Sequence, residues 1–249
     1  MGLTISAQND EMITDRPDQT ESAVTVQKSM FQLETGFLYQ YDEIGLLQIK
    51  DYVYNTSLIR YGLLDNLELR FGFGYQARKY TNETIDFENT NRAWNPMTFG
   101  IKTNISAQKG MIPQLALLTT LNLNTAGDQV FGEEYTGMDL RLVAAHQLND
   151  WLGLGYNAGA IWSGGQAWPV YFYSVSAGIS LSGRLGCFAE VYGYLPEFSH
   201  PDHRMDAGFT FLILDKLQLD LSGGIGLSEI SPDYFIGTGL SWKFRPWPE

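Results

Sequence analysis

Apolar and polar residues alternate along most of this chain from Met30 onward. In residues 67–78, every residue of one parity is apolar or aromatic and none of the other parity is, and residues 217–228 nearly repeat this pattern. A period of two is typical of β-strands that lie between two unlike environments. Weaker alternation recurs elsewhere, so the sequence predicts about twelve strands, at residues 31–41, 51–61, 67–78, 97–107, 113–123, 136–147, 151–162, 170–182, 185–195, 205–213, 217–228 and 235–244.

The connections between these strands alternate in length. Short connections rich in Gly, Asn and Asp, which are typical of tight hairpins, are expected at residues 63–66, 108–110, 148–150, 182–184 and 215–216. Longer polar connections are expected at residues 42–49, 81–96, 124–135, 163–169, 196–204 and 229–234. This layout predicts an all-β protein, a transmembrane antiparallel up-and-down β-barrel with short periplasmic turns and longer extracellular loops.

Charge, hydropathy and cysteine content narrow the class of protein. The 249 residues carry a formal net charge of −12, a mean hydropathy of −0.15 and one cysteine. The chain lacks the apolar run of about 18 residues that a spanning helix needs, a cysteine pair for a disulfide, and the clustered basic residues of a nucleic-acid-binding protein. A membrane β-barrel is compatible with these values, because alternating strands leave the average hydropathy near zero.

The width of the predicted barrel decides whether the apolar parity points outward or inward. A closed sheet of about twelve strands is too wide for inward apolar side chains to fill, so the apolar parity is expected to face lipid. The alternative is a soluble barrel or sandwich with that parity inside.

The opposite parity then lines the lumen and carries charges of both signs. A strongly selective pore would show a ring of one sign, whereas mixed signs favour pairing inside the barrel over a solute path. Arg60 is not assigned to this face, because residues 51–61 alternate poorly. The predicted lumen residues are Glu34, Glu68, Arg70, Arg78, Lys102, Asp139, Arg141, Glu190, Asp206, Asp220 and Lys243.

Residues 1–29 form a polar, acidic N-terminal segment without periodicity. One interpretation is a flexible periplasmic tail. The other is a lumen plug, in which Asp15, Arg16 and Asp18 enter the barrel from the periplasmic side and pair with lumen charges, for which Arg70, Arg141 and Lys102 are the candidates. The barrel is assigned to residues 30–245 and a short C-terminal tail to residues 246–249.

Other motifs indicate neither catalysis nor a bound cofactor. The G-x-G-x-x-A stretches at residues 72–77 and 153–158 open no helix and therefore offer no amides for a pyrophosphate. A metal site is not expected at His200 and His203, and no serine is marked out as the partner of a histidine. We therefore expect no enzyme, no metal and no cofactor.

Several stretches together resemble an outer-membrane "transporter" family labelled as a meta-pathway of phenol degradation and common in Bacteroidetes-type and other Gram-negative bacteria. They are TDRPDQTES (14–22), FQLETGF (31–37), NTSLIRYGLLDNLELR (55–70), FGIKTN (99–104), FAEVYGY (188–194), LQLDLSGGIGLS (217–228) and YFIGTGLSWKF (234–244). The resemblance implies a small outer-membrane barrel whose substrate is usually unassigned.

The sequence therefore favours passive passage of a small solute through a bacterial outer-membrane barrel with periplasmic termini. The alternative is a closed accessory or structural barrel that acts as a subunit of a larger outer-membrane complex. The expected partners are outer-membrane lipid, lipopolysaccharide and other outer-membrane proteins, but not nucleic acid.

Overall fold

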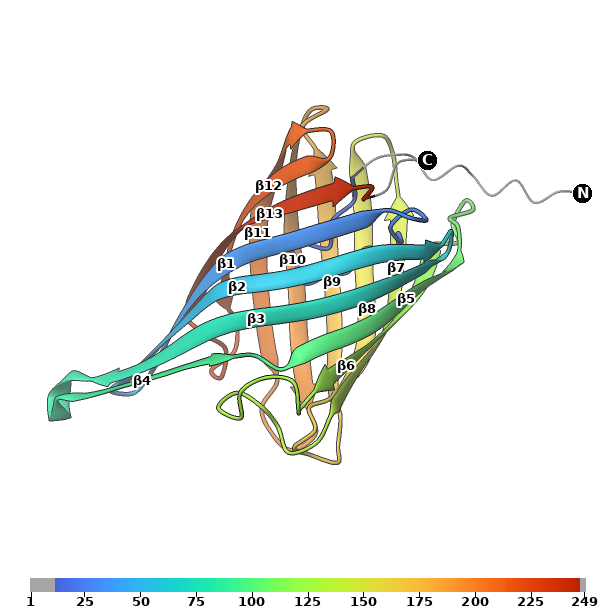
Figure 1. Cartoon of the computed structure of the whole chain (residues 1–249). Helices are drawn as coiled ribbons and strands as arrows, with labels where there is room; N and C mark the ends of the chain where they lie inside the picture. Colours follow the sequence, from blue (N-terminus) through green and yellow to red (C-terminus); the bar gives the residue numbers. More distant parts are fainter. Residues whose placement is uncertain (1–11, 247–249) are drawn as a thin grey trace, which may run out of the picture.

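Twelve strands close into an antiparallel barrel, because β2 pairs with both β1 and β3 and β13 pairs back onto β1. The structure is a computed structural model that describes residues 12–246 (Figure 1). Within these residues no helix is long and apolar enough to cross a membrane. The strands are β1 (Phe31–Ile44), β2 (Leu47–Leu64), β3 (Leu67–Asn82), β4 (Phe87–Trp94), β5 (Met97–Ser106), β6 (Gln114–Leu123), β7 (Gly137–Gln147), β8 (Leu152–Trp162), β9 (Val170–Ser180), β10 (Leu185–Pro196), β11 (Asp202–Leu214), β12 (Leu217–Gly226) and β13 (Tyr234–Phe244).

The thirteenth strand, β4, continues the line of β5 beyond the barrel wall. Both strands pair antiparallel with β3, β5 along its first half and β4 along its second half. Asn95 and Pro96 interrupt them and shift the register by one residue, because Pro has no N–H for the ladder. The prediction of a barrel of about twelve strands is thus confirmed, and the β3–β4 hairpin extends away from it (Figure 1).

Two of the predicted long loops were wrong. Residues 42–49 are mostly strand, closed by a tight turn at Gly45 and Leu46, and residues 81–96 hold a short 3-10 turn (Glu83–Ile85) and β4. Both hairpins project past the barrel wall, so water reaches both faces of their strands and the alternation that marks a lipid-facing strand is lost.

The apolar parity faces outward, so the soluble alternative was wrong. Phe209 and Leu221, which pair across β11 and β12, are 54% and 52% exposed, whereas Asp220, the residue before Leu221, is 3% exposed. An exposed apolar surface that surrounds a polar interior is the arrangement of a barrel in lipid.

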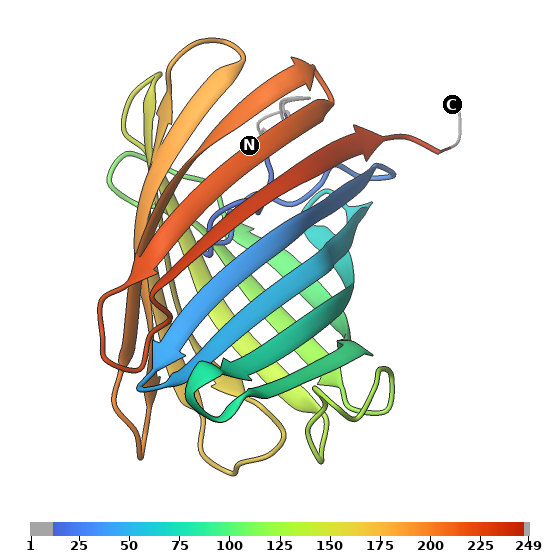
Figure 2. The ribbon, with the colours of Figure 1, turned by 90° about the vertical axis from the view of Figure 1, so that its left-hand side faces the viewer.

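The beginning of β1 and the end of β13 lie side by side, since Phe31 pairs with Phe244. The short β2–β3 turn at Asp65 and Asn66 lies at the same end, because Phe31 also pairs with Tyr61. From this short-turn end the residues before β1 turn back into the barrel (Figure 2). Residues 1–11 and 247–249, the ends of the predicted segment and tail, lie outside the described residues.

Candidate functional site: the lumen and its N-terminal segment

Residues 12–28, called the N-terminal segment below, lie inside the barrel against its polar inner face. Met12, Ala23 and Val26 are buried there. Inward charges on the wall are buried as well: Glu34, Glu68, Arg70, Lys102, Glu190, Asp206, Asp220 and Lys243 are each 5% exposed or less. Such burial is tolerable only where charges are paired or hydrogen-bonded, and the segment supplies many of the partners.

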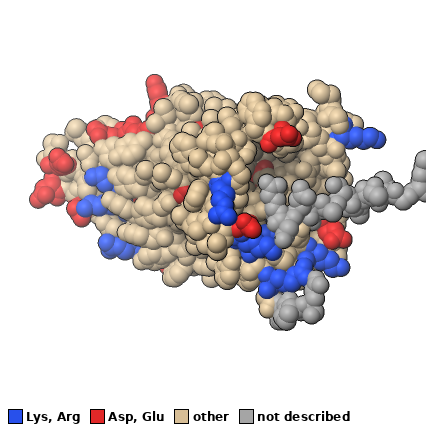
Figure 3. All heavy atoms as spheres, turned by 90° about the horizontal axis from the view of Figure 1, so that it is seen from above, with Lys and Arg blue, Asp and Glu red and all other residues tan. Residues whose placement is uncertain are grey.

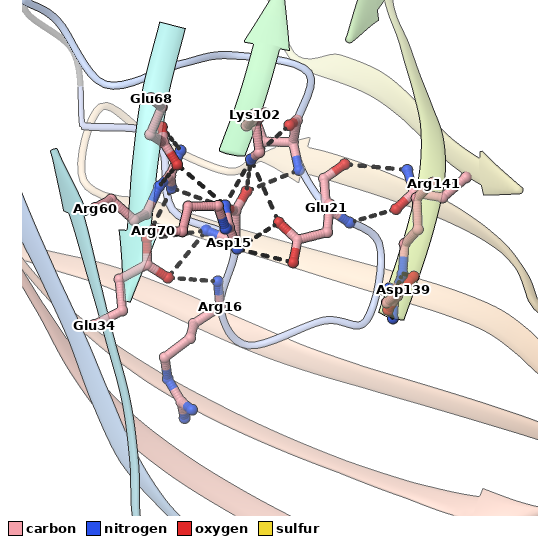
Figure 4. A network of polar contacts seen from close by, with 12 residues as sticks. Asp15, Arg16, Glu21, Glu34, Arg60, Glu68, Arg70, Lys102, Asp139 and Arg141 are labelled. Carbon is pink, nitrogen blue, oxygen red and sulfur yellow. Dashed lines mark hydrogen bonds and ion pairs between the residues drawn. The ribbon is translucent and has the colours of Figure 1, made fainter. Parts of the chain in front are cut away.

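Asp15 lies at the centre of a cluster of cations that we call the basic wall, made of Arg60 on β2, Arg70 on β3 and Lys102 on β5 (Figure 4). Its Oδ2 atom lies 3.0 Å from Arg60 Nη1, 2.6 Å from Arg70 Nη1 and 2.8 Å from Lys102 Nζ. Glu21 adds a second carboxylate, 2.9 Å from Arg70 Nη2. The structure thus brings Asp15 to Arg70 and Lys102 but not to Arg141.

Two wall carboxylates hold the backbone of the segment. Glu34 accepts hydrogen bonds from the backbone N–H groups of Asp15 and Arg16, both at 3.1 Å, and Glu68 accepts one from Val26 at 2.8 Å. Each carboxylate also pairs with Arg60 at 2.8 Å. These bonds fix both ends of the segment to the strands β1, β2 and β3.

Arg60 is the main lumen residue that the sequence analysis missed. Beta-bulges interrupt β2, with register shifts between Val53 and Asn55 and between Gly62 and Leu64. A bulge adds a residue and reverses which parity faces inward, so alternation across residues 51–61 could not assign Arg60. The unbalanced carboxylates Glu34 and Glu68 on neighbouring strands were the available signal.

Arg16 occupies a cradle made by two glycines that pair across β1 and β13, Gly36 and Gly239. A Cβ atom at either glycine would overlap its guanidinium. Arg16 donates to Asp220 through Nε at 3.2 Å and Nη2 at 3.0 Å, and to Thr56 through Nη1 at 2.9 Å. These lumen glycines therefore leave room for an arginine of the segment.

The N-terminal segment also contacts the acidic wall, which we define as Glu190 on β10 and Asp206 on β11. The two residues face each other in the strand register. Glu190 accepts hydrogen bonds from the Gln19 backbone N–H at 2.7 Å and from the Thr20 hydroxyl. Asp206 Oδ1 is buried without a hydrogen-bond partner.

Three further predicted lumen charges, Asp139, Arg141 and Arg78, form ion pairs away from Asp15. Asp139 and Arg141 form a pair on β7 at 2.7 Å, and Arg141 lies 4.1 Å from the ring centre of Phe172. Arg78 pairs with Asp51 at 2.6 Å on the β2–β3 ladder. Lys243 is buried on β13.

The segment also has an apolar contact. Ala23 packs with Ala116, Leu118 and Val143, which are inward residues of β6 and β7. An apolar run on the inward parity of two adjacent strands was therefore a signal in the sequence for a docked segment.

The segment divides the space inside the barrel. A cavity of about 670 Å³ lies on the side of the long loops and one of about 520 Å³ on the side of the short turns. Among the described residues, only Arg16 and Glu21 line both cavities. A solute that crosses the barrel must therefore pass the N-terminal segment.

Burial alone would raise the pKa of Asp15, but Arg60, Lys102 and Arg70 outweigh it and hold the pKa well below its usual value. For Asp18 the net shift of the pKa has the opposite direction. Burial inside the barrel and the nearby Glu190 carboxylate raise its pKa well above the usual value. The two aspartates of the segment thus meet opposite electrostatic surroundings.

Of the predicted pairings, the structure shows those of Asp15 with Arg70 and Lys102. Arg16 pairs with Asp220, which was not among the partners predicted for the segment. Asp18 has no ion pair within residues 12–246. In the same range no group of three metal-ligating side chains is placed to hold a metal ion.

Comparisons with known proteins bear on the whole barrel. The sequence model of the family described as "Putative MetA-pathway of phenol degradation" matches residues 14–244. No functionally curated protein sequence matches the chain.

Solved barrels resemble it in fold. The COG4313 outer membrane channel from Pseudomonas putida F1 has a TM-score of 0.71 and 11% identity over 90% of this chain and 98% of its own. The KdgM porin has a TM-score of 0.55 and 8% identity over 86% and 99%. The CymD monoaromatic hydrocarbon channel has a TM-score of 0.50 and 9% identity over 88% and 89%.

Proposed function

Because this chain belongs to the family described as "Putative MetA-pathway of phenol degradation", and its fold is that of outer-membrane channels, we propose that it is a passive channel for a small solute. In this proposal the barrel lies in a bacterial outer membrane, both termini face the periplasm, and lipid and lipopolysaccharide surround the apolar belt. The two cavities that meet at the N-terminal segment are the observation that carries the proposal.

The charges along the path favour an uncharged solute. In the cavity on the loop side, Arg16, Arg70 and Arg141 are all engaged by carboxylates of the chain. At the short-turn end, charged side chains of both signs lie around the opening (Figure 3). An ion would have to compete with buried pairs, whereas an uncharged solute meets no such cost.

Apolar and amide side chains both line the same cavity. Leu58, Leu118 and Ile161 are among the lining residues, as are Asn55 and Asn122. This mixture suits a small solute that has an apolar body and a few hydrogen-bonding groups.

Liposome swelling tests the proposal. Vesicles that contain the purified full chain should swell in isotonic solutions of small uncharged solutes, and the rate should fall as solute size rises. Charged solutes of equal size should enter more slowly. Vesicles that swell with none of the solutes would overturn the channel and leave the closed accessory barrel.

A further inference from the structure

No cation within residues 12–246 forms an ion pair with the carboxyl groups at the acidic wall. Glu190 and Asp206 are 2% and 4% exposed and directly opposite in the register, and the half-buried Asp18 directly precedes Gln19 and Thr20, which both hydrogen-bond to Glu190. Gln19 and Thr20 each donate a hydrogen bond to Glu190 and not to Asp206. The buried Asp206 Oδ1 has no partner.

The cations nearest in the fold are committed elsewhere. On the segment, Arg16 pairs with Asp220 of β12, and on β11, Arg204 pairs with Asp202 at 2.5 Å. On β7, Arg141 pairs with Asp139. The adjoining inward side chains of β8 and β9 are neutral, namely Asn157, Ser174 and Ser176.

Three carboxyl groups this close together, two of them buried and Asp18 half-buried, cannot all be ionised while the segment is docked. Glu190 accepts two hydrogen bonds and is therefore best suited to remain a carboxylate. At least one proton must then reside on Asp18 or Asp206, where it removes the repulsion that would push the segment off the wall.

We propose that residues 17–20 form a proton-held latch. The latch stays on the acidic wall while the set of three carboxyl groups, Asp18, Glu190 and Asp206, keeps a proton. It leaves the wall when all three are ionised. Asp15 remains bound to the basic wall and acts as the hinge. Release of the latch widens the short-turn cavity along β9, β10 and β11 and opens it toward the loop-side cavity, with which it shares Arg16 and Glu21. The inference rests on the proposed channel function and adds its regulation.

The opened passage is negatively charged. Asp18, Glu190 and Asp206 would line it as carboxylates, whereas Arg60, Arg70 and Lys102 would stay occupied by Asp15, Glu34 and Glu68. A passage bordered by carboxylates prefers cations. The latch therefore predicts that conductance and cation preference rise together with pH.

Planar bilayer recordings of the full chain test this. Between about pH 5 and about pH 9 in a KCl gradient, the open probability should rise, by about tenfold for each unit by which docking raises the pKa of the group. The reversal potential should shift toward that of K⁺ over the same range. In the double variant Glu190→Gln with Asp206→Asn, both changes should shrink strongly, because amides do not ionise and Asp18 is the one carboxyl group left at this site.

A matched control removes two exposed loop carboxylates instead, in the variant Glu197→Gln with Glu229→Gln. It should keep the pH response of the unmodified chain. A channel that conducts equally at every pH would overturn the latch and leave the channel function intact. A chain that passes neither ions nor uncharged solutes at any pH would overturn the channel function itself.

Hydrogen exchange gives a readout that is independent of conduction. At high pH, after correction for intrinsic rates, the Gln19 amide bonded to Glu190 should lose protection, and the Val26 amide bonded to Glu68 should keep it. Equal protection of the two amides at both pH values would contradict the hinge and the latch.

Discussion

The two walls that hold the N-terminal segment differ in how their charge is compensated. On the basic wall, Arg60, Arg70 and Lys102 face Asp15, Glu21, Glu34 and Glu68, with distances of 2.6–3.4 Å between paired atoms. On the acidic wall, Glu190 and Asp206 lie beside Asp18 and the hydrogen-bond donors of the segment, and no cation within residues 12–246 pairs with them. The ion pairs of the basic wall resist detachment of the segment, whereas attachment to the acidic wall depends on a bound proton. One segment can thus be anchored at one side and released at the other.

The largest expected effect is at the centre of the basic wall. Asp15→Ala leaves three buried cations with one carboxylate fewer, and removing one partner of a buried pair costs about 3–5 kcal/mol. Urea unfolding in detergent micelles, followed by tryptophan fluorescence, should show this loss. The exposed loop variant Glu229→Ala is the control and should unfold like the unmodified chain. Equal midpoints for Asp15→Ala and the control would show that the basic wall does not anchor the segment.

A smaller effect is expected at the glycine cradle. Gly239→Ala places a Cβ atom against the Arg16 guanidinium, and such overpacking costs about 1–3 kcal/mol. The Arg16–Asp220 pair should weaken and hydrogen exchange in residues 14–18 should speed up. Gly178→Ala on β9 is the matched control, because its Cβ would meet no atom within 4 Å. If both variants exchange alike, Arg16 is not held by the cradle.

Acid should weaken the basic wall and spare the acidic wall. The pKa of Asp15 is depressed in the folded state, so its contribution is present above its ordinary pKa of 3.8 and is lost as pH falls below that value. The pKa of Asp18 is raised, so its contribution is present at low pH and is lost as pH rises. Stability measured from about pH 2 to about pH 4 should rise with pH, and Asp15→Asn should flatten this rise. An unchanged slope in Asp15→Asn would assign the acid sensitivity to another group.

The smallest effect is expected outside both walls. Lys79 and Glu88 form a pair at 2.9 Å on the β3–β4 hairpin, with side chains 32% and 62% exposed. Exposed pairs contribute less than about 1 kcal/mol, so Lys79→Ala should leave the unfolding midpoint and the conductance almost unchanged. A large loss would mean that the projecting hairpin supports the barrel.

The sequence by itself determined the barrel, its outward apolar face and most of its inward charges. Period-two alternation reports directly on a strand between lipid and a polar interior, so Leu221 and Asp220 could be assigned to opposite faces from the sequence alone. Where water reaches both faces, as at residues 87–94, that signal vanishes, and the sequence predicts a loop instead of the strand.

Only the tertiary structure decided which charges meet. Asp15 reaches Arg60, Arg70 and Lys102 from at least 45 positions away in sequence, and the bulges in β2 hid the inward direction of Arg60. Pairing between distant strands depends on barrel closure and register, which local periodicity does not encode. For the same reason the contrast between a compensated basic wall and a carboxyl-rich acidic wall emerged only once the segment was placed inside the barrel.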